Sequence, residues 1–468
     1  MTNCSNVGGR LTVLSQIYQH SKGDFLRKLF TIALPITLQS ILFASKGLVD
    51  VMMMGQLSET DIAAIGVSSR ALFVVTILIG GVTTGGALLT AQYWGAGNKK
   101  GVRESVALAW ATALVAALLI ITTFTLFPEY IMMLASDSKQ VIAQGSDYLM
   151  ITSFSMLSLA YISSVAAGLR SVHEPMVSTV FSALGIVLNV LFNWILIFGH
   201  WGFPALGIQG AAIGTLTASI IEALALCIYL RFKAHLLSFK MSDVVSVMTK
   251  DRVRHFLSLS MPTTFNFLAW AGGLFAYTAI MGQTGEAGLV ALSVMTPIES
   301  ISLSLLVGIA NASGVLVGNQ LGAKRFDAVY YQAITLVVVA IVVTMTTSIV
   351  LYTFSVPILN LFTALEGETR ALTETFFGIL CVGNMLRSLP TVLVVGVLRA
   401  GGDVKFCLYQ DMFTQWFFGI PLAAIGAIWL GFPPQWVFAM FFLEAVFKWG
   451  SCTYRLRSRK WMKNLIDA

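Results

Sequence analysis

Residues 29–54 read LFTIALPITLQSILFASKGLVDVMMM, and within this run only Lys46 and Asp50 carry charge. A helix rises about 1.5 Å per residue, so such a run is long enough to cross the roughly 30 Å hydrocarbon core of a bilayer. Further runs of similar length follow near 65–89, 105–127, 146–169, 176–198, 208–230, 257–281, 289–317, 329–354, 375–398, 406–430 and 434–454. Because the runs are apolar on all faces, whereas barrel strands alternate polar and apolar residues, they predict an all-α membrane protein with twelve transmembrane helices.

The composition of the whole chain agrees with this interpretation. The 468 residues are 57% hydrophobic and 11% charged, with a mean hydropathy of +0.81, whereas soluble proteins are typically about 25% charged. The polar segment 1–28 lacks the short apolar core of a signal peptide, so we expect it to be retained. Five scattered cysteines predict neither a disulfide framework nor a metal cluster.

Positive charge is distributed so that it predicts the orientation of the chain. With the N-terminus placed inside, the outer loops hold only Lys139 and Arg370, whereas 23 of the 29 lysines and arginines lie in tails and inner loops. This pattern satisfies the positive-inside rule and predicts that both termini are cytoplasmic. We expect a multi-pass protein of a bacterial plasma (inner) membrane. The net charge of +7 therefore indicates contact with anionic lipid and not nucleic-acid binding.

The two halves of the chain repeat each other at a constant offset of 227 residues. The matched positions are Pro35 with Pro262, Met54-Gly55-Gln56 with Met281-Gly282-Gln283, Gly81 with Gly308, and Gly95-Ala96 with Gly322-Ala323. The predicted domains are a cytoplasmic tail (1–28), an N-lobe (29–230), a basic linker (231–256), a C-lobe (257–454) and a C-terminal cytoplasmic tail (455–468). Six helices per half make the repeat parallel, as in alternating-access transporters with two pseudo-symmetric six-helix bundles.

Asp50 is the first candidate for ion coupling. Inserting a charged side chain near the bilayer centre costs at least about 2.5–3.5 kcal/mol, so such a residue is expected to have an ion-pair partner or a function in transport. Its repeat counterpart is Tyr277, so the acid exists in one lobe only. The alternative is that Asp50 caps its helix or pairs with Lys46, which lies one helical turn earlier.

Asn189, Asn193 and Thr215 complete the predicted cation site. The two asparagines are four residues apart and share a helix face, and Thr215 lies in the next helix. Carboxylate, amide and hydroxyl oxygens bind hard cations, and they also relay protons. The alternative is that these groups only form interhelical hydrogen bonds. No metal cofactor is expected, apart from Na⁺ as an alternative coupling ion at Asp50.

In the C-lobe, the aromatic residues Phe265, Trp270 and Tyr277 suit an apolar cavity that attracts cations. Arg387 and Glu299 are further candidates for the cavity wall, since each is a charge inside an apolar run. The alternative for all of these residues is structural packing or a satisfied structural charge.

Further charged residues lie within predicted helices. Glu444 and Lys448 are spaced to neutralise each other, Asp411 is expected to reach the inner interface, and Glu222 has no partner that the sequence identifies.

Enzyme motifs are poorly matched. Residues 95–101, GAGNKKG, lack the spacing and the terminal Ser or Thr of a P-loop. His173-Glu174 is followed by Pro175 and not by the second histidine of a zinc protease motif. We therefore expect a protein that is not an enzyme and has no organic cofactor.

Taken together, residues 34–55, 261–283, 168–170 (GLR) and 398–403 (LRAGGD) resemble the multidrug and toxic compound extrusion (MATE) family. The resemblance implies that the two bundles form a V around a central cavity. It also implies export of organic cations, drugs and antibiotics driven by H⁺ or Na⁺.

Residue by residue, Asp50 matches the family's first-helix acid, Pro35 matches the proline hinge of that helix, and Asn189 matches the fifth-helix asparagine. Asn193 stands where many members have a second acid. Trp270 and Ser388 stand near the positions where some Na⁺-coupled members have acids, so a C-lobe Na⁺ site is not supported.

The predicted function is secondary active antiport that exports amphipathic or cationic molecules. One alternative is a lipid or oligosaccharide-lipid flippase of the same superfamily, to which a groove rich in Arg and Lys would point. A membrane-embedded enzyme is a second alternative, but it would require clustered polar residues at one depth, and no histidine lies deep in a predicted helix. The expected partners are a small-molecule substrate, a coupling cation and membrane lipids, and we expect a monomer.

Overall fold

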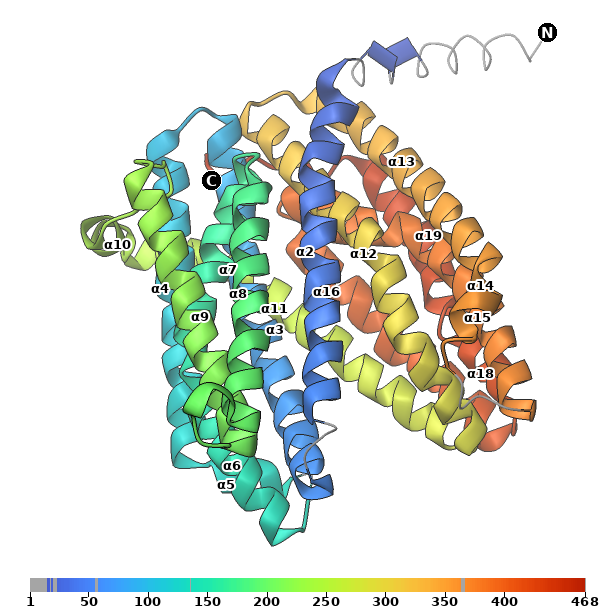
Figure 1. The fold of residues 1–468 in the computed structure, drawn as a ribbon. Helices are drawn as coiled ribbons and strands as arrows, with labels where there is room; N and C mark the ends of the chain where they lie inside the picture. Colours follow the sequence, from blue (N-terminus) through green and yellow to red (C-terminus); the bar gives the residue numbers. More distant parts are fainter. Residues whose placement is uncertain are drawn as a thin grey trace, which may run out of the picture. The chain divides into compact units, whose positions relative to one another are not determined.

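The computed structural model describes residues 15–16, 18–19, 23–54, 58–134, 136–362 and 367–467, and within these ranges the side chains at 47, 48, 50–52, 54 and 59 are outside the description. In the described ranges the regular structure is entirely helical (Figure 1). The longer helices are α2 (Asp24–Met54), α3 (Glu59–Gly95), α4 (Lys99–Leu126), α6 (Lys139–Ser153), α7 (Ser155–Ser171), α8 (Pro175–Phe198), α9 (Gly207–Phe232), α11 (Lys250–Gly282), α12 (Glu286–Gly322), α13 (Phe326–Thr353), α15 (Gly367–Thr391) and α19 (Leu443–Ser458). The shorter ones are α5 (Pro128–Met133), η1 (His200–Gly202), α10 (Met241–Val247), α14 (Ser355–Leu359), η2 (Val392–Leu398), α16 (Val404–Asp411), η3 (Met412–Gly419), α17 (Ile420–Ala424), η4 (Ile425–Trp429) and α18 (Pro434–Met440).

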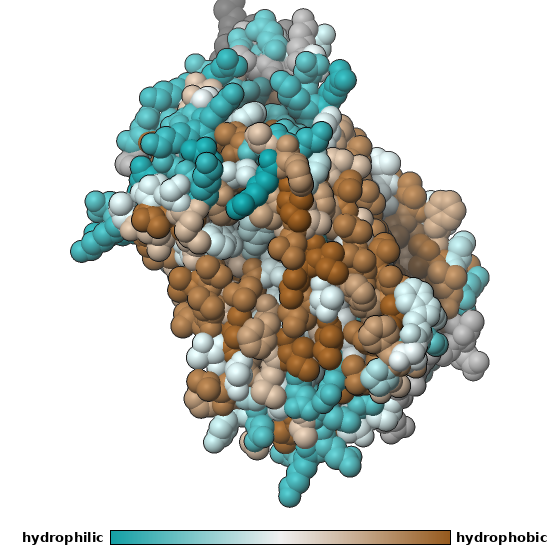
Figure 2. Space-filling model, turned by 60° about the vertical axis from the view of Figure 1, so that its left-hand side comes forward, coloured by the Kyte–Doolittle hydropathy of each residue, from teal (hydrophilic) through white to brown (hydrophobic). Residues whose placement is uncertain are grey.

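The predicted all-α membrane fold is confirmed. Among the described helices, ten are long and apolar enough to cross a membrane, and there are eleven if α6 and α7, bent by 45° at their junction, form one span. The twelfth predicted span, 434–454, falls on α18 and α19, which are interrupted after Met440. Figure 2 shows apolar side chains across the middle of the displayed face and hydrophilic side chains gathered at both ends.

Contacts divide the chain into two compact units. Unit 1 comprises Met1–Thr37, Ala91–Gly97 and Ala269–Ala468, and unit 2 comprises Leu38–Thr90 and Asn98–Leu268. The division passes through the helices α2, α3 and α11, whereas the predicted lobes meet at the linker 231–256. The lobe boundaries remain a prediction.

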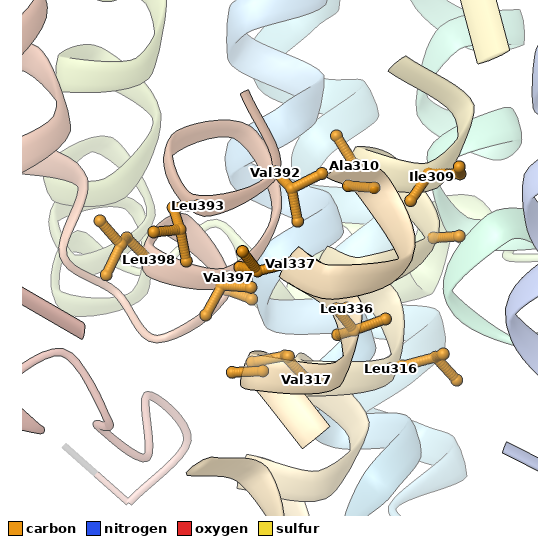
Figure 3. Packing of buried hydrophobic residues seen from close by; sticks show 14 of the residues in the cluster. Ile309, Ala310, Leu316, Val317, Leu336, Val337, Val392, Leu393, Val397 and Leu398 are labelled. Atoms are coloured by element: carbon orange, nitrogen blue, oxygen red, sulfur yellow. The ribbon is translucent and has the colours of Figure 1, made fainter. Parts of the chain in front are cut away.

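The core of unit 1 is a cluster of aliphatic side chains where α12, α13 and η2 meet. Figure 3 shows Ile309, Ala310, Leu316 and Val317 of α12, Leu336 and Val337 of α13, and Val392, Leu393, Val397 and Leu398 of η2. Gly396 has no side chain, which allows η2 to lie close to the carbonyl oxygen of Ala310. A Cβ atom on this glycine would lie only 2.5 Å from that oxygen. The π-helical turn η2 follows Pro390, which removes one backbone donor from α15.

The internal repeat appears as matched helix contacts, one within each unit. In unit 2, a Cβ atom on Gly81 of α3 would lie 2.6 Å from the Cα atom of Thr264 in α11. In unit 1, a Cβ atom on Gly308 of α12 would collide with Thr37 of α2. Both members of these pairs are related by the offset of 227 residues. Each glycine therefore allows the first helix of one half to approach the second helix of the other half.

A second matched contact joins the ends of α3 and α12 within unit 1. A Cβ atom on Gly95 would collide with the carbonyl group of Asn319, and one on Gly322 would collide with the carbonyl group of Gln92. The offset relates Gly95 to Gly322 and Gln92 to Asn319. The two helix ends therefore cross at equivalent turns.

The segment after α19 binds at this crossing through Gln92. The fully buried Gln92 amide donates to the carbonyl oxygens of Ala400 (2.9 Å) and Lys463 (3.1 Å), and its Oε1 accepts from the backbone N–H of Leu465 (2.6 Å). Trp461 is also fully buried, and its backbone packs against Gly401. The C-terminal segment is thus an integral part of unit 1.

We expect Gln92→Ala to destabilise the protein by about 2–4 kcal/mol, because three backbone groups, two of them buried, lose a hydrogen bond at once. Thermal unfolding in detergent should show a melting temperature lowered by several degrees. The matched control is Gln209→Ala, which removes an exposed contact with Asp147. Equal melting temperatures for the two variants would contradict this account of the C-terminal segment.

Candidate functional site

Three of the predicted site residues lie together at the seam between α8 and α9 in unit 2. Pro175 starts α8, where its missing N–H removes no hydrogen bond, and Gly199 ends the helix with a φ of +76°. Between these ends, Asn189 and Asn193 face α9 and are only 2% and 1% exposed. The amide nitrogen of Asn189 donates to the hydroxyl of Thr215 at 3.0 Å.

Asn189 leaves one strong acceptor at this seam. Its Oδ1 atom is buried and accepts no hydrogen bond from the described residues. Buried acceptors are nearly always satisfied by a donor, water or an ion. The seam therefore offers a place for a cation or for the proton of a neutral acid.

Glycine makes room for the second amide. A Cβ atom on Gly214 of α9 would lie 2.5 Å from Oδ1 of Asn193. The small-residue run at the start of α9, in which Gly210 packs on the backbone of Leu196, lets the two helices approach closely.

Asp50 belongs to α2, which continues through this position to Met54. Its side chain lies outside the described residues. The assignment of Asp50 to the seam, and that of Na⁺ as an alternative ligand there, therefore remain predictions.

A second polar group lies between α2, α8 and α9, and sequence reasoning did not find it. The amide of Gln39 donates to the hydroxyl of Ser182 at 2.9 Å. That hydroxyl in turn hydrogen-bonds Glu222, on which the charge of Lys46 also acts. A Cβ atom on Gly185 would collide with the Glu222 carboxylate. Lys46, which the sequence offered as an alternative partner of Asp50, therefore acts on Glu222.

In unit 1 the two charged candidates for the cavity wall form a pair. Arg387 of α15 forms an ion pair with Glu299 of α12, and its guanidinium group lies 4.5 Å from the ring centre of Phe442. Each charged side chain is 22% exposed. Arg387 and Glu299, predicted as candidates for a substrate cavity, thus satisfy each other.

A second network in unit 1 surrounds Lys448. Its ammonium group lies 2.9 Å from Asp411 and 3.4 Å from Glu444. The hydroxyl of Tyr277 donates to Glu444 at 3.0 Å. The pairing of Glu444 with Lys448 matches the expectation, and Asp411, which was expected at the inner interface, also binds Lys448.

The aromatic candidates differ in exposure. Tyr277 is buried and packs against Phe441, with ring centres 4.3 Å apart. Phe265 and Trp270 are about half exposed, and their place in a substrate cavity stays a prediction. Among the described residues, no group of three or more His, Cys, Asp or Glu is arranged to hold a metal ion.

Comparison with known proteins identifies the family. The MatE family model matches residues 35–195 and 262–425, two stretches that begin at the repeat-related prolines Pro35 and Pro262. The chain belongs to the MatE family. MATE proteins are transporters, so this chain is a membrane transporter and not an enzyme.

Relatives cover nearly the whole chain. The "Uncharacterized transporter YisQ" of Bacillus subtilis is 27% identical over 439 residues, which are 93% of this chain and 95% of the relative. The "Probable multidrug resistance protein NorM" of Rhizobium meliloti is 26% identical over 395 residues, which are 82% and 84% of the two chains. A solved MATE structure in complex with MaL6 shares the fold with a TM-score of 0.85 at 16% identity, covering 94% of this chain and 98% of its own. A transporter of the MOP superfamily from Pyrococcus furiosus gives a TM-score of 0.84 with the same identity and coverage.

Proposed function

We propose that this MATE-family transporter is a secondary active antiporter that exports amphipathic, cationic small molecules in exchange for H⁺ or Na⁺. The observation that carries the proposal is the buried Oδ1 of Asn189, an acceptor without a described donor at a seam of polar side chains. The hydrogen bond between Gln39 and Ser182 brings α2, the helix that bears Asp50, to α8. Relatives named as probable multidrug resistance proteins support the class of substrate.

In this proposal Asp50 is the coupling acid. A proton removes its charge and Na⁺ compensates it, and either event changes which conformation of α2 is favoured. Asn189, Asn193 and Thr215 would bind the same ion or accept the proton's hydrogen bond. The free energy of ion entry would thereby drive export of the substrate.

Pro35 is proposed as the hinge of α2. It lies inside the helix, and the contact division cuts α2 at Thr37, two residues later. The Thr37 hydroxyl also bonds back to the carbonyl oxygen of Ala33 at 2.9 Å, a contact that often bends helices. Proline and threonine together make bending at this point comparatively easy.

The remaining features of the proposal follow from topology. We propose a monomer in a bacterial inner membrane with both termini cytoplasmic, as the distribution of lysine and arginine indicates. A lipid flippase is a weaker alternative, because Arg387 is engaged by Glu299 and Lys46 acts on Glu222. A groove lined by unpaired basic residues would favour that alternative.

The proposal is tested by transport of a fluorescent cationic dye into everted vesicles. A pH gradient and a Na⁺ gradient are imposed separately, and protein-free vesicles serve as the control. We expect the pH gradient alone, in Na⁺-free buffer, to drive dye accumulation. Dye transport that depends on neither gradient, or transport of labelled lipid in place of dye, would overturn the proposal.

The preference for H⁺ follows from the number of carboxylates at the predicted site. With Asn193 in place of an acid, the site has one carboxylate, which suffices for a proton but attracts Na⁺ weakly. We therefore expect Asn193→Asp to increase the stimulation of dye transport by Na⁺ about tenfold.

The matched control for this variant is Asn384→Asp, which adds a carboxylate at a buried asparagine of unit 1. Its transport should show no new dependence on Na⁺. A strict Na⁺ requirement in the unchanged protein would contradict the preference for H⁺.

A further inference from the structure

Glu222 is an acid inside the membrane-spanning part of α9 to which the proposed coupling site assigns no role. It lies 15 residues after Gly207 and ten before Phe232, so it is at least about 15 Å from either end of the helix. Placing a carboxylate at that depth in the membrane costs free energy. Such residues usually form an ion pair, bind a ligand or relay protons.

The surroundings of Glu222 form a built site from three helices. Gly185 of α8 leaves the space that the carboxylate fills, since a Cβ atom there would collide with it. Ser182, 1% exposed, hydrogen-bonds the carboxylate and accepts from the 8% exposed Gln39 of α2. Among the described residues, the charged group that acts on Glu222 is Lys46, also of α2.

This arrangement accommodates both protonation states of the acid. The hydroxyl of Ser182 can donate to a carboxylate while it accepts from Gln39, and its second lone pair can accept from a carboxylic acid.

Glu222 is also in register with the seam that contains Asn189. Ser182 and Asn189 are seven residues apart on α8, and Thr215 and Glu222 are seven apart on α9. Seven residues are close to two helical turns, about 10.5 Å along the axis, so both polar groups lie on the same faces. Glycine accommodates the polar side chain at each level, Gly214 for Asn193 and Gly185 for Glu222.

We propose that Glu222 is a second cation-coupling residue, a carboxylate between α8 and α9 that takes up and releases one proton in each transport cycle. This inference rests on the proposed antiport function. Proton uptake converts the carboxylate to the neutral acid and breaks no covalent bond, and release returns the proton to water on the other side of the membrane. The charge of Lys46 acts on Glu222, and in the sequence Lys46 lies one helical turn before Asp50.

The test counts the protons that the full-length protein releases when it binds the cationic dye in detergent, in weakly buffered, Na⁺-free solution with a pH indicator. We expect about two protons per dye for the wild type and about one for either Glu222→Gln or Asp50→Asn, because each substitution removes one titrating group. The dye affinity of Glu222→Gln should stay within about threefold of the wild type. Glu444→Gln, which changes an acid of unit 1, is the matched control and should release the wild-type number.

If Glu222→Gln alone fails to fold, Lys46→Gln combined with Glu222→Gln keeps the test decisive, because the double variant removes the acid together with the positive charge that acts on it. It should also release about one proton. Unchanged release in the variants at Glu222, with reduced release in Asp50→Asn, would overturn the role of Glu222 and leave the antiport proposal standing. Absence of proton release in the wild type would overturn both.

Discussion

Asp50→Asn is expected to abolish gradient-driven efflux, with at least about a hundredfold loss of dye accumulation. An amide keeps the size and the hydrogen-bonding groups of the carboxylate, but it neither titrates nor attracts a cation by charge. Expression and the melting temperature should remain near those of the wild type. The measurement is dye accumulation in vesicles under an imposed pH gradient, normalised to the amount of folded transporter.

Glu444→Gln is the matched control for this prediction. Tyr277 can still donate to the new amide oxygen, and Lys448 keeps Asp411 at 2.9 Å. We expect its transport to fall only slightly. If Asp50→Asn exports dye at the wild-type rate, Asp50 is structural and the proposed coupling site is wrong.

Arg387→Met is expected to cause the largest loss of stability, about 3–5 kcal/mol, because it leaves Glu299 as an unpaired carboxylate within the helix bundle. The variant also loses the stacking of the guanidinium group on Phe442. Thermal unfolding in detergent, followed by tryptophan fluorescence, measures the effect.

Two further variants separate pairing from a general effect of losing arginine. Arg370→Met removes an exposed pair with Glu374 at 3.3 Å, and such pairs contribute about 0–1 kcal/mol. Glu299→Gln added to Arg387→Met should restore most of the stability, because neither half-buried position then carries an unpaired charge. Equal melting temperatures for Arg387→Met and Arg370→Met would contradict the account of this pair.

Local patterns in the sequence predicted the spans and part of the site. The bilayer thickness sets the length of the apolar runs, so the spans can be located from a single sequence. The four-residue spacing of Asn189 and Asn193 fixes their common helix face, and the structure places both at the seam with Thr215. The repeat offset predicted equivalent positions, and Gly95 and Gly322 make equivalent contacts at the crossing of α3 and α12.

Partners distant in the chain could not be predicted in this way. Arg387 and Glu299 are 88 residues apart, and only the packing of α15 on α12 brings them together. Asp411 likewise reaches Lys448 through tertiary packing, whereas hydropathy alone suggested the interface. Lys46 and Glu222 are far apart in the sequence, so the action of the Lys46 charge on Glu222 could not be predicted, whereas Asp50 lies only four residues from Lys46.

The site around Glu222 nevertheless had a signal in the sequence. Glu222 follows Thr215 by seven residues, and Ser182 precedes Asn189 by seven, so each pair shares a helix face. The polar residues two helical turns from Asn189 and Thr215, on the same helix faces, are Ser182 and Glu222. The break between α18 and α19 after Met440 has no comparable signal, since Met440 and Leu443 both suit a continuous helix.

The central claim of ion-coupled antiport is tested most directly by running the exchange in reverse in proteoliposomes. A gradient of the cationic dye is imposed with equal pH and no Na⁺ on both sides, and the internal pH is followed. We expect dye movement to drive protons in the opposite direction in the wild type and not in Asp50→Asn. Dye flux through the wild type without any proton movement would contradict it.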